Sequence, residues 1–371
     1  MRGMISQIVT LGVLAACAPS LSESVNSEAS IFGAGETADF TFTSSDLQLS
    51  GVFDTPSGGE AEALVLFVHG YGPSDVRGWN SYADLRQRFN EIGIATAVWD
   101  KPGQGLSEGE FDINQSVYSS AQEVVDAAKF LRESNAPGAK KIGIWGVSRA
   151  GWIAPIAMSQ DAELNFWISV SGTTAEDNFA YLLLSNLPHE GGTLDFSEQL
   201  ADEWRAGCEL FRTGASYEQY QSATEALRAN EYIKSMRGDW QTQAQYEAQQ
   251  QSCEEGVCAN IDQDMCSYVF IPDFDVMLGS LDVDVLAIFG ERDLNVDWRK
   301  TRDFYQATLA DNPESSLVIE TFAGADHNLN LAETGSIREM QAMAAPVKAD
   351  GYYQVQIDWL REHVIGQDPK E

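Results

Sequence analysis

The sequence predicts an α/β fold in which helices flank a central, mostly parallel sheet, with a helical cap inserted into it. Unbroken apolar runs, typical of strands covered on both faces, alternate with segments of helical periodicity over residues 63–170. The alternation stops near Ser171 and resumes at Val283. The intervening stretch of about a hundred residues is polar and helical, and it is longer than any plain loop should be. One sheet domain with an insertion explains these observations.

The individual elements follow from apolar periodicity. The expected strands are Ala38–Thr43, Leu47–Asp54, Ala63–Val68, Ile94–Trp99, Lys141–Trp145, Phe166–Val170, Val283–Phe289 and Leu317–Phe322. The first two alternate apolar and polar residues as a half-buried hairpin does. The expected helices of this domain are Trp79–Ile92, Ser116–Glu133, Arg149–Ser159, Trp298–Leu309 and Tyr352–His363. The resulting division is a signal segment at 1–16, a tether at 17–36, the sheet domain at 37–172 and 281–371, and the cap at 173–280.

The composition is strongly acidic. Among 371 residues, 56 Asp and Glu outnumber 23 Lys and Arg, which gives a net charge of −33. A surface of this charge repels the phosphate backbone, so we expect no binding to nucleic acid. The hydrophobic fraction of 44% is sufficient for a large core.

The N-terminus has the pattern of an export signal. Arg2 precedes a short apolar stretch that ends in Leu14-Ala15-Ala16-Cys17. The stretch is too short to be a stable membrane span. Its end resembles the bacterial lipobox, which implies acylation of Cys17, cleavage before it, and a lipid anchor in the cell envelope on the extracytoplasmic side. An ordinary signal peptide that happens to precede a cysteine is the alternative.

Four further cysteines cluster in the expected cap. They are Cys208, Cys253, Cys258 and Cys266. In an oxidising compartment this predicts two disulfides, with three possible pairings. The alternatives are four free thiols, or a zinc site of four thiolates, for which the spacing lacks the usual tight cysteine pair. We expect no metal and no cofactor.

A nucleophile motif follows the third buried strand. Gly146-Val147-Ser148-Arg149-Ala150-Gly151 stands directly after a strand and opens a helix. This is the setting in which G-x-S-x-G forms a sharp turn that exposes the serine hydroxyl at the sheet edge. The second small position holds Ala150 in place of glycine, and Gly151 follows it. Ser148 is therefore the candidate nucleophile.

A second motif, His69-Gly70-Tyr71-Gly72, follows the first buried strand. With these two motifs the chain resembles the α/β-hydrolase superfamily, whose members bear an HG-containing loop at this point. The resemblance implies that the backbone N–H groups of Tyr71 and Arg149 form the oxyanion hole. We expect His69 to hold the loop through hydrogen bonds and to have no role in proton transfer.

The candidate acid follows the strand Val283–Phe289. Asp293, in Gly290-Glu291-Arg292-Asp293, lies where a triad carboxylate must project from a sheet, and Gly-x-x-Asp matches the acid loop of the superfamily. Asp297 and Glu291 are local competitors, and Asp297 could instead cap the next helix.

The candidate base is His327, in a loop after the last strand. It is the one histidine of four that follows both Ser148 and Asp293 on such a loop. A neutral imidazole suits proton abstraction near pH 7. Asp326 is a poor partner for the ring because adjacent side chains rarely face each other. The order Ser, Asp, His is that of the superfamily.

The resemblance covers residues 38–172 and 281–366, and Asp100-Lys-Pro-Gly-Gln-Gly-Leu-Ser107 adds a further loop of the superfamily. The sequence is most similar to serine aminopeptidase-like and prolyl-oligopeptidase-related esterases. The resemblance implies an α/β-hydrolase fold and a serine hydrolase that cleaves a carboxylic ester through an acyl-enzyme. A serine peptidase with the same triad is the first alternative, and an acyl-CoA thioesterase is less plausible outside the cytoplasm. A non-catalytic surface lipoprotein that binds a ligand is the alternative from another class.

The cap contributes aromatic residues whose role the sequence leaves open. They either line an apolar pocket for the substrate or pack the core of the cap itself. They are Phe179, Tyr181, Trp204, Phe211, Tyr217, Tyr220, Tyr232, Trp240 and Tyr246.

Overall fold

The structure is a computed structural model that describes residues 32–113, 115–174, 178–237, 240–254, 269, 271–310 and 312–366. The expected signal segment, Cys17, and most of the tether lie outside the described residues, as do Cys258, Cys266 and the side chain of Cys253. Among the described residues, no helix is both long enough and apolar enough to cross a membrane.

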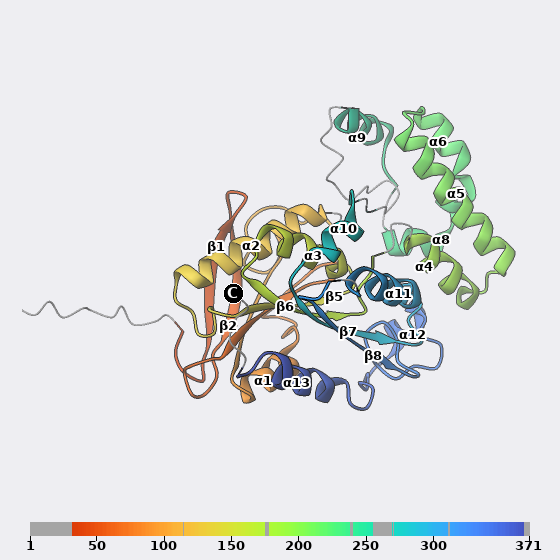
Figure 1. Ribbon diagram of the computed structural model, residues 1–371. Coiled ribbons are helices and arrows are strands. Elements are labelled where there is room, and N and C mark those ends of the chain that lie inside the picture. The colour runs from red at the N-terminus through yellow and green to blue at the C-terminus, as the bar shows by residue number, and fades with distance from the viewer. Residues whose placement is uncertain are drawn as a thin grey trace, which may run out of the picture.

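A single sheet forms the centre of the molecule (Figure 1). Its eight strands, counted within the described residues, stand in the order β1-β2-β4-β3-β5-β6-β7-β8. The first two are antiparallel to their neighbours and the others are parallel. The strands are β1 (Thr37–Ser44), β2 (Leu47–Asp54), β3 (Ala63–Val68), β4 (Ile94–Trp99), β5 (Ile142–Val147), β6 (Leu164–Val170), β7 (Asp284–Gly290) and β8 (Ser316–Phe322). This confirms the expected fold class.

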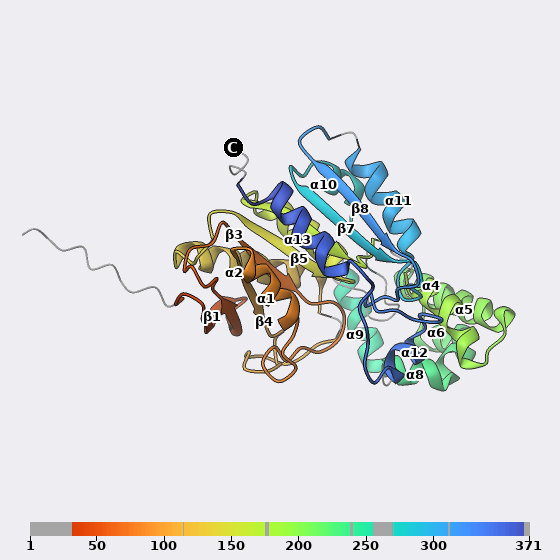
Figure 2. The same ribbon diagram turned by 90° about the horizontal axis from the view of Figure 1, so that it is seen from below.

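Helices cover both faces of the sheet (Figure 2). One face packs against α2 (Val117–Glu133), α3 (Ala150–Gln160), α10 (Phe274–Gly279) and α11 (Trp298–Leu309), and the other against α1 (Ala83–Glu91) and α13 (Tyr352–His363). Alternate residues of β3 serve the two cores: Leu64 and Leu66 point to the first, and Val65 and Phe67 to the second. This is why the buried strands are apolar without alternation.

The helix expected at Trp79–Ile92 is shorter in the structure. It begins at Ala83, because Asn80 and Tyr82 have positive φ values of 50° and 58°. A right-handed helix cannot pass through such residues. The ring of Tyr82 stacks on Phe67 and packs at a tilt against Trp145, with centroids 5.5 and 4.9 Å away, which favours the turn over the helix.

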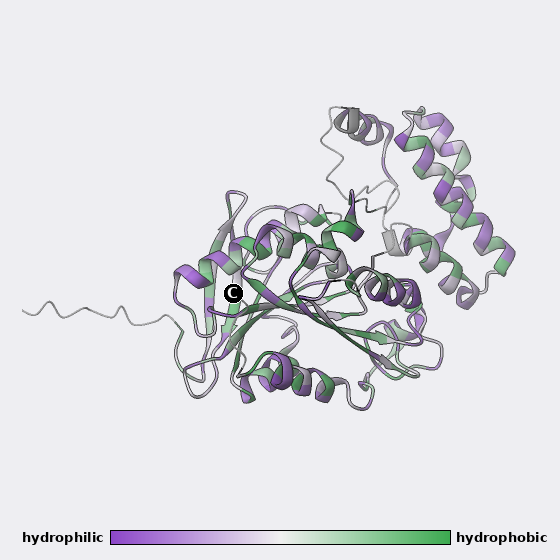
Figure 3. Ribbon diagram, in the orientation of Figure 1, coloured by the Kyte–Doolittle hydropathy of each residue, from purple (hydrophilic) through white to green (hydrophobic). Residues whose placement is uncertain are grey.

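The segment between β6 and β7 is helical and projects from one end of the sheet (Figure 1). It comprises α4 (Asn178–Asn186), the 3₁₀ turn η1 (Leu187–Glu190), α5 (Leu194–Arg212), α6 (Tyr217–Ala223), α7 (Glu225–Ala229), α8 (Glu231–Arg237) and α9 (Gln243–Glu254), before α10 returns to the sheet domain. Hydrophilic and hydrophobic stretches alternate along its helices (Figure 3). All the aromatic residues named above except Tyr181 pack in two clusters within this cap. Helix α12 (Ile337–Ala342), which follows β8, was not expected from the sequence.

Candidate active site

Ser148 occupies a sharp turn between β5 and α3. Its φ is 56°, a conformation that costs a residue with a side chain about 1–3 kcal/mol. Its backbone N–H donates to the carbonyl oxygen of Val170 at the end of β6, 2.9 Å away. The strained turn is thus held by the neighbouring strand, and Ser148 lies at the carboxyl edge of the parallel strands.

The small residues around Ser148 are required by close packing. A Cβ atom on Gly146 would lie 2.7 Å from the Cβ of Ala150, so the alanine methyl already fills the space beside Gly146. A Cβ on Gly151 would lie 2.5 Å from the carbonyl oxygen of Thr173. The turn therefore accepts Ala150 at the second small position, while Gly151 has no room for a side chain.

Asp293 and His327 form a buried pair. The Nδ1–H of His327 donates to Oδ2 of Asp293 at 2.8 Å, which leaves Nε2 of the ring to accept a proton. The other carboxylate oxygen of Asp293 accepts the N–H groups of Asn295 and Val296 at 2.8 and 2.9 Å. Exposed fractions of 1% for Asp293 and 8% for His327 keep the pair largely out of water.

The electrostatics of His327 suit a base oriented by a carboxylate. Burial lowers the pKa of the ring, but the charge and the hydrogen bond of Asp293, with a smaller effect of Asp326, raise it above its ordinary value. Both nearby charges favour the imidazolium that a general base becomes during the reaction.

Ser171 links the base to the strand that holds the nucleophile. It follows Val170 directly, has a φ of 47°, and is fully buried. Its N–H donates to the carbonyl oxygen of Ile288 at 2.8 Å, and its hydroxyl donates to the backbone carbonyl of His327 at 2.7 Å. Adjacent residues at the end of β6 thus fix the backbones of Ser148 and His327. The sequence analysis missed Ser171, whose one signal was its position at the end of a strand.

The competing carboxylates have other partners. Asp297 caps α11 by accepting the N–H of Lys300 at 3.1 Å. Glu291 accepts the hydroxyl of Thr321 at the surface. Asp326 accepts the N–H groups of Asn328 and Asn330 through one oxygen and shapes the loop that bears His327. Burial raises the pKa of Asp326.

His69 holds the loop that follows β3. Its Nε2–H donates to the carbonyl oxygen of Trp99 at 2.8 Å, and the Tyr82 hydroxyl donates to its Nδ1 at 3.2 Å. Burial, together with the charge of Lys101, lowers the pKa of His69 to about 4, so the ring is neutral. Both ring nitrogens are occupied by structural hydrogen bonds.

The comparisons with known proteins identify the family of the chain. A family model described as serine aminopeptidase, S33, matches residues 59–331. The chain belongs to this family. This membership confirms the expected resemblance to the α/β-hydrolase superfamily and to its serine aminopeptidase-like branch. No curated protein matches the sequence.

Solved structures with the same fold include esterases and a peptidase. An esterase of Pyrococcus furiosus has a TM-score of 0.52 at 14% identity, with 89% of this chain and 92% of that chain covered. Est1E from Butyrivibrio proteoclasticus, with ferulic acid bound, has a TM-score of 0.51 at 14% identity, with coverages of 88% and 98%. The acylaminoacyl peptidase of Pyrococcus horikoshii has a TM-score of 0.50 at 14% identity. The match covers 92% of this chain and 44% of the peptidase chain.

Lys101 orients the HG loop of this S33 family member. Its Nζ donates to the carbonyl oxygens of Gly70 and Gly72 at 2.6 and 2.7 Å. Because a trans peptide is planar, the N–H of Tyr71 points away from the Gly70 carbonyl and therefore away from Lys101. The loop also passes beside the nucleophile, since a Cβ on Gly70 would lie 3.2 Å from the Cβ of Ser148. Lys101 thereby sets the direction of one expected oxyanion donor.

Replacement of Lys101 by Met should lower kcat by about 10-fold or more with little change in KM, because the Tyr71 N–H would lose its fixed direction. Steady-state ester hydrolysis measures both constants. Lys129→Met, on an exposed part of α2, is the matched control. Equal kcat values for the two folded variants would show that the Lys101 contacts do not orient a catalytic group.

The cap of this family member is attached to the acid loop through one face of α4. Four side chains of α4 donate to backbone carbonyls of residues 293–295, at 2.7–2.8 Å: Asn178, Tyr181, Ser185 and Asn186. The Tyr181 hydroxyl donates to Asp293 itself. The side-chain oxygen of Asn186 accepts the N–H of Ile337, which ties α4 to α12 as well. The cap therefore supports the acid loop from outside, a role that the sequence analysis missed.

Within the described residues, no group of three or more His, Cys, Asp or Glu side chains is arranged to hold a metal ion. Cys208 is buried in α5 among apolar residues of the cap. The expected disulfides involve three cysteines whose side chains lie outside the described residues, so their pairing stays a prediction.

Proposed function

We propose that this protein is a serine hydrolase that cleaves carboxylic esters through an acyl-enzyme on Ser148. The observation that carries the proposal is the buried pair of Asp293 and His327, joined by a hydrogen bond of 2.8 Å. Through Ser171, this pair is attached to the same strand end as the strained turn of Ser148. A buried carboxylate that orients an imidazole, with a serine on a sharp turn held by the same strand end, supplies the parts of a catalytic triad.

In the proposed reaction, His327 Nε2 takes the proton of Ser148 as its hydroxyl attacks the ester carbonyl carbon. The N–H groups of Tyr71 and Arg149 stabilise the oxyanion. His327 then returns the proton to the leaving alcohol. Water, deprotonated by the same ring, attacks the acyl-enzyme, and the carboxylic acid leaves as Ser148 recovers its proton.

Peptide hydrolysis by the same triad is the second candidate. It is favoured by the description of the S33 family and by the fold shared with an acylaminoacyl peptidase. The difference concerns the substrate pocket and the leaving group, because both reactions use the same serine, acid and base.

Labelling of the full chain with a fluorophosphonate tests the proposal. The wild type should be labelled, Ser148→Ala should not, and His327→Ala should be labelled far more slowly, because the probe needs an activated serine. Alkyl esters and aminoacyl anilides of equal size, compared by kcat/KM, then separate esterase from peptidase. A folded wild-type protein that resists the probe would contradict the proposal and favour a non-catalytic binding protein.

We further propose that Cys17 bears a lipid in the bacterial cell envelope, on the extracytoplasmic side, and that the four cap cysteines form two disulfides. The support is the charge, length and cleavage pattern of residues 1–17 and the even number of cysteines in one region. The mass of the protein purified from membranes, before and after reduction and alkylation, tests both expectations.

A further inference from the structure

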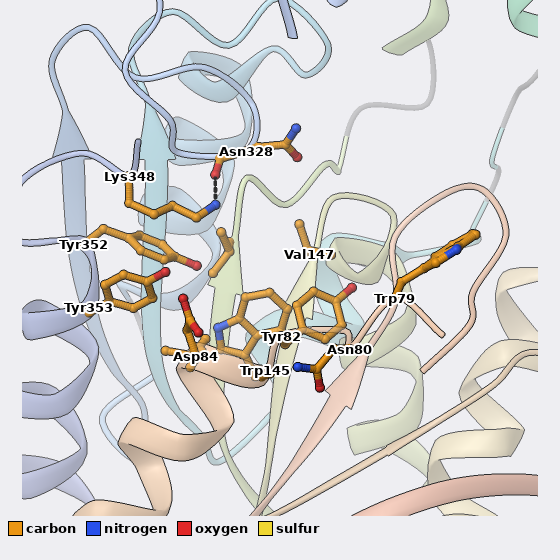
Figure 4. Close-up of a pocket in the computed structure, with 13 residues that line it drawn as sticks. Trp79, Asn80, Tyr82, Asp84, Trp145, Val147, Asn328, Lys348, Tyr352 and Tyr353 are labelled. Carbon is orange, nitrogen blue, oxygen red and sulfur yellow. Dashed lines mark hydrogen bonds between the residues drawn. The ribbon is translucent and has the colours of Figure 1, made fainter. Parts of the chain in front are cut away.

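A cavity of about 430 Å³ has among its lining residues the sequence neighbours of Ser148 and His327. Figure 4 shows the side chains that line it. The cavity is open to solvent on one side and bordered by the start of α1, the ends of β5 and β6, and the start of α13, on the face of the sheet that α1 and α13 cover. Val147, which precedes Ser148, and Asn328, which follows His327, both line it. Its volume is in the range of small-molecule sites. All its lining residues belong to the sheet domain and none to the cap helices.

Aromatic rings form the walls of this cavity. Tyr82 and Trp145 form one side, with centroids 4.9 Å apart, and Tyr352 and Tyr353 form another, with centroids 5.1 Å apart. Figure 4 shows these rings around the same space. The N–H of Trp145 donates to the side chain of Gln356 at 2.8 Å. The Tyr82 hydroxyl donates to His69 Nδ1. The polar groups of Tyr82 and Trp145 therefore both have hydrogen-bond partners within the protein. Trp145 is only 2% exposed, so the apolar surface on this side of the cavity belongs mainly to the half-buried Tyr82.

One cation stands at the edge of the cavity. The Nζ of Lys348 lies 5.3 Å from the centroid of the Tyr352 ring and donates to the backbone carbonyl of Asn328 at 2.6 Å. An ammonium group has three N–H donors, so a ligand acceptor can share this nitrogen. Asp84 lines the cavity from α1, which disfavours a ligand whose negative charge lies at that side. The cavity thus combines aromatic residues with one cationic donor, Lys348, at one side.

We infer that this cavity holds an aromatic ring of the substrate, attached close to the scissile ester and bearing a hydrogen-bond acceptor that faces Lys348. The inference rests on the proposed function, because it takes the ester to lie between Ser148 and His327. A flat ring can meet the walls edge to face or offset, arrangements that a saturated ring of the same size cannot adopt. Val147 and Asn328 line the cavity and adjoin Ser148 and His327 in the chain, so we place the ring within two or three bonds of the carbonyl carbon that Ser148 attacks.

Two matched ester series test the inference with the full chain. Ethyl 3-phenylpropanoate is compared with ethyl 3-cyclohexylpropanoate, and benzyl propanoate with cyclohexylmethyl propanoate, by titration of the released acid. We expect kcat/KM about 10-fold higher for the aromatic member of at least one series. Tyr353→Leu, which removes a wall, should abolish most of this preference. Tyr118→Leu, the same change on α2 away from the cavity, should leave it intact.

Binding without turnover separates this inference from the proposed function. In Ser148→Ala, calorimetric titration should detect 3-(4-hydroxyphenyl)propanoate and find 3-cyclohexylpropanoate at least 10-fold weaker. Adding Lys348→Met should reduce the advantage of the hydroxylated over the unsubstituted phenyl ligand. Aromatic binding in a protein that hydrolyses no ester would support the cavity and contradict the proposed function. Ester hydrolysis with no aromatic preference, or with a preference that Tyr353→Leu leaves unchanged, would overturn the inference and leave the proposed function standing.

Discussion

Replacement of Ser148 by alanine is expected to lower kcat for ester hydrolysis by on the order of 10⁶-fold, with little change in KM. The hydroxyl is the atom that forms the acyl-enzyme, so its loss removes the reaction path and leaves the substrate contacts in place. The measurement is kcat from initial rates at saturating ester. Trace contamination by wild-type enzyme is monitored with the fluorophosphonate.

The matched control is Ser159→Ala, at the exposed end of α3. Its hydroxyl donates to the backbone carbonyl of Ile156, and its loss should leave kcat within about 2-fold of wild type. A Ser148→Ala variant that keeps more than about one hundredth of the wild-type kcat would exclude the acyl-enzyme mechanism.

Asp293→Asn is expected to lower kcat by about 10⁴-fold. An asparagine that keeps the contacts with the N–H groups of Asn295 and Val296 through its oxygen would turn its NH₂ group toward Nδ1 of His327. The ring would then accept at Nδ1 and carry its proton on Nε2, the nitrogen that must receive the proton of Ser148. The comparison is kcat for the folded variant against Asp297→Asn, which retains an N-cap residue at the start of α11.

The same substitution should move the pH profile in a defined direction. Burial lowers the pKa of His327, and Asp293 reverses that effect and raises it above its ordinary value. Activity needs the neutral ring, so kcat/KM falls as the pH drops through this pKa. Without the charge of Asp293 the pKa falls, and the acid limb of the residual activity should move to lower pH. An acid limb at unchanged pH would mean that another group controls it.

The sheet, and the loops in which the candidate triad residues lie, could be predicted because both depend on local patterns. Apolar runs marked the parallel strands, and Ser148, Asp293 and His327 each stand in a loop that follows one of them. In a parallel sheet these loops meet at one edge. The helix expected from Trp79 began late because packing of the Tyr82 ring overrode helical periodicity.

The supports of the site could not be predicted in this way. Lys101 reaches Gly70 and Gly72 across about thirty residues of chain, and Ser171 reaches His327 across 156. Their hydrogen bonds depend on the order of strands in the sheet, and the loop motif that contains Lys101 does not indicate which carbonyls its side chain reaches. The attachment of α4 to the acid loop has the same character, because polar residues on a cap helix acquire a meaning only when the opposing backbone is known.

The register of the first strands determines at which edge of the sheet the described chain begins, and therefore how the protein can be immobilised on a surface. Thr37, the first residue of β1, pairs with Asp54, and Asp54 pairs with Thr96 in the first half of β4. Because β4 is parallel to β3, its first half lies at the amino edge of the parallel strands, whereas Ser148 lies at their carboxyl edge. The strand β1 therefore begins at the edge of the sheet opposite Ser148. The N–H of Gly366, near the other end of the described chain, donates at 2.8 Å to Glu62, which directly precedes β3 at that same edge. A resin or electrode coupled near Thr37 or Gly366 would hold the molecule at this edge of the sheet and leave Ser148, at the opposite edge, facing the solution.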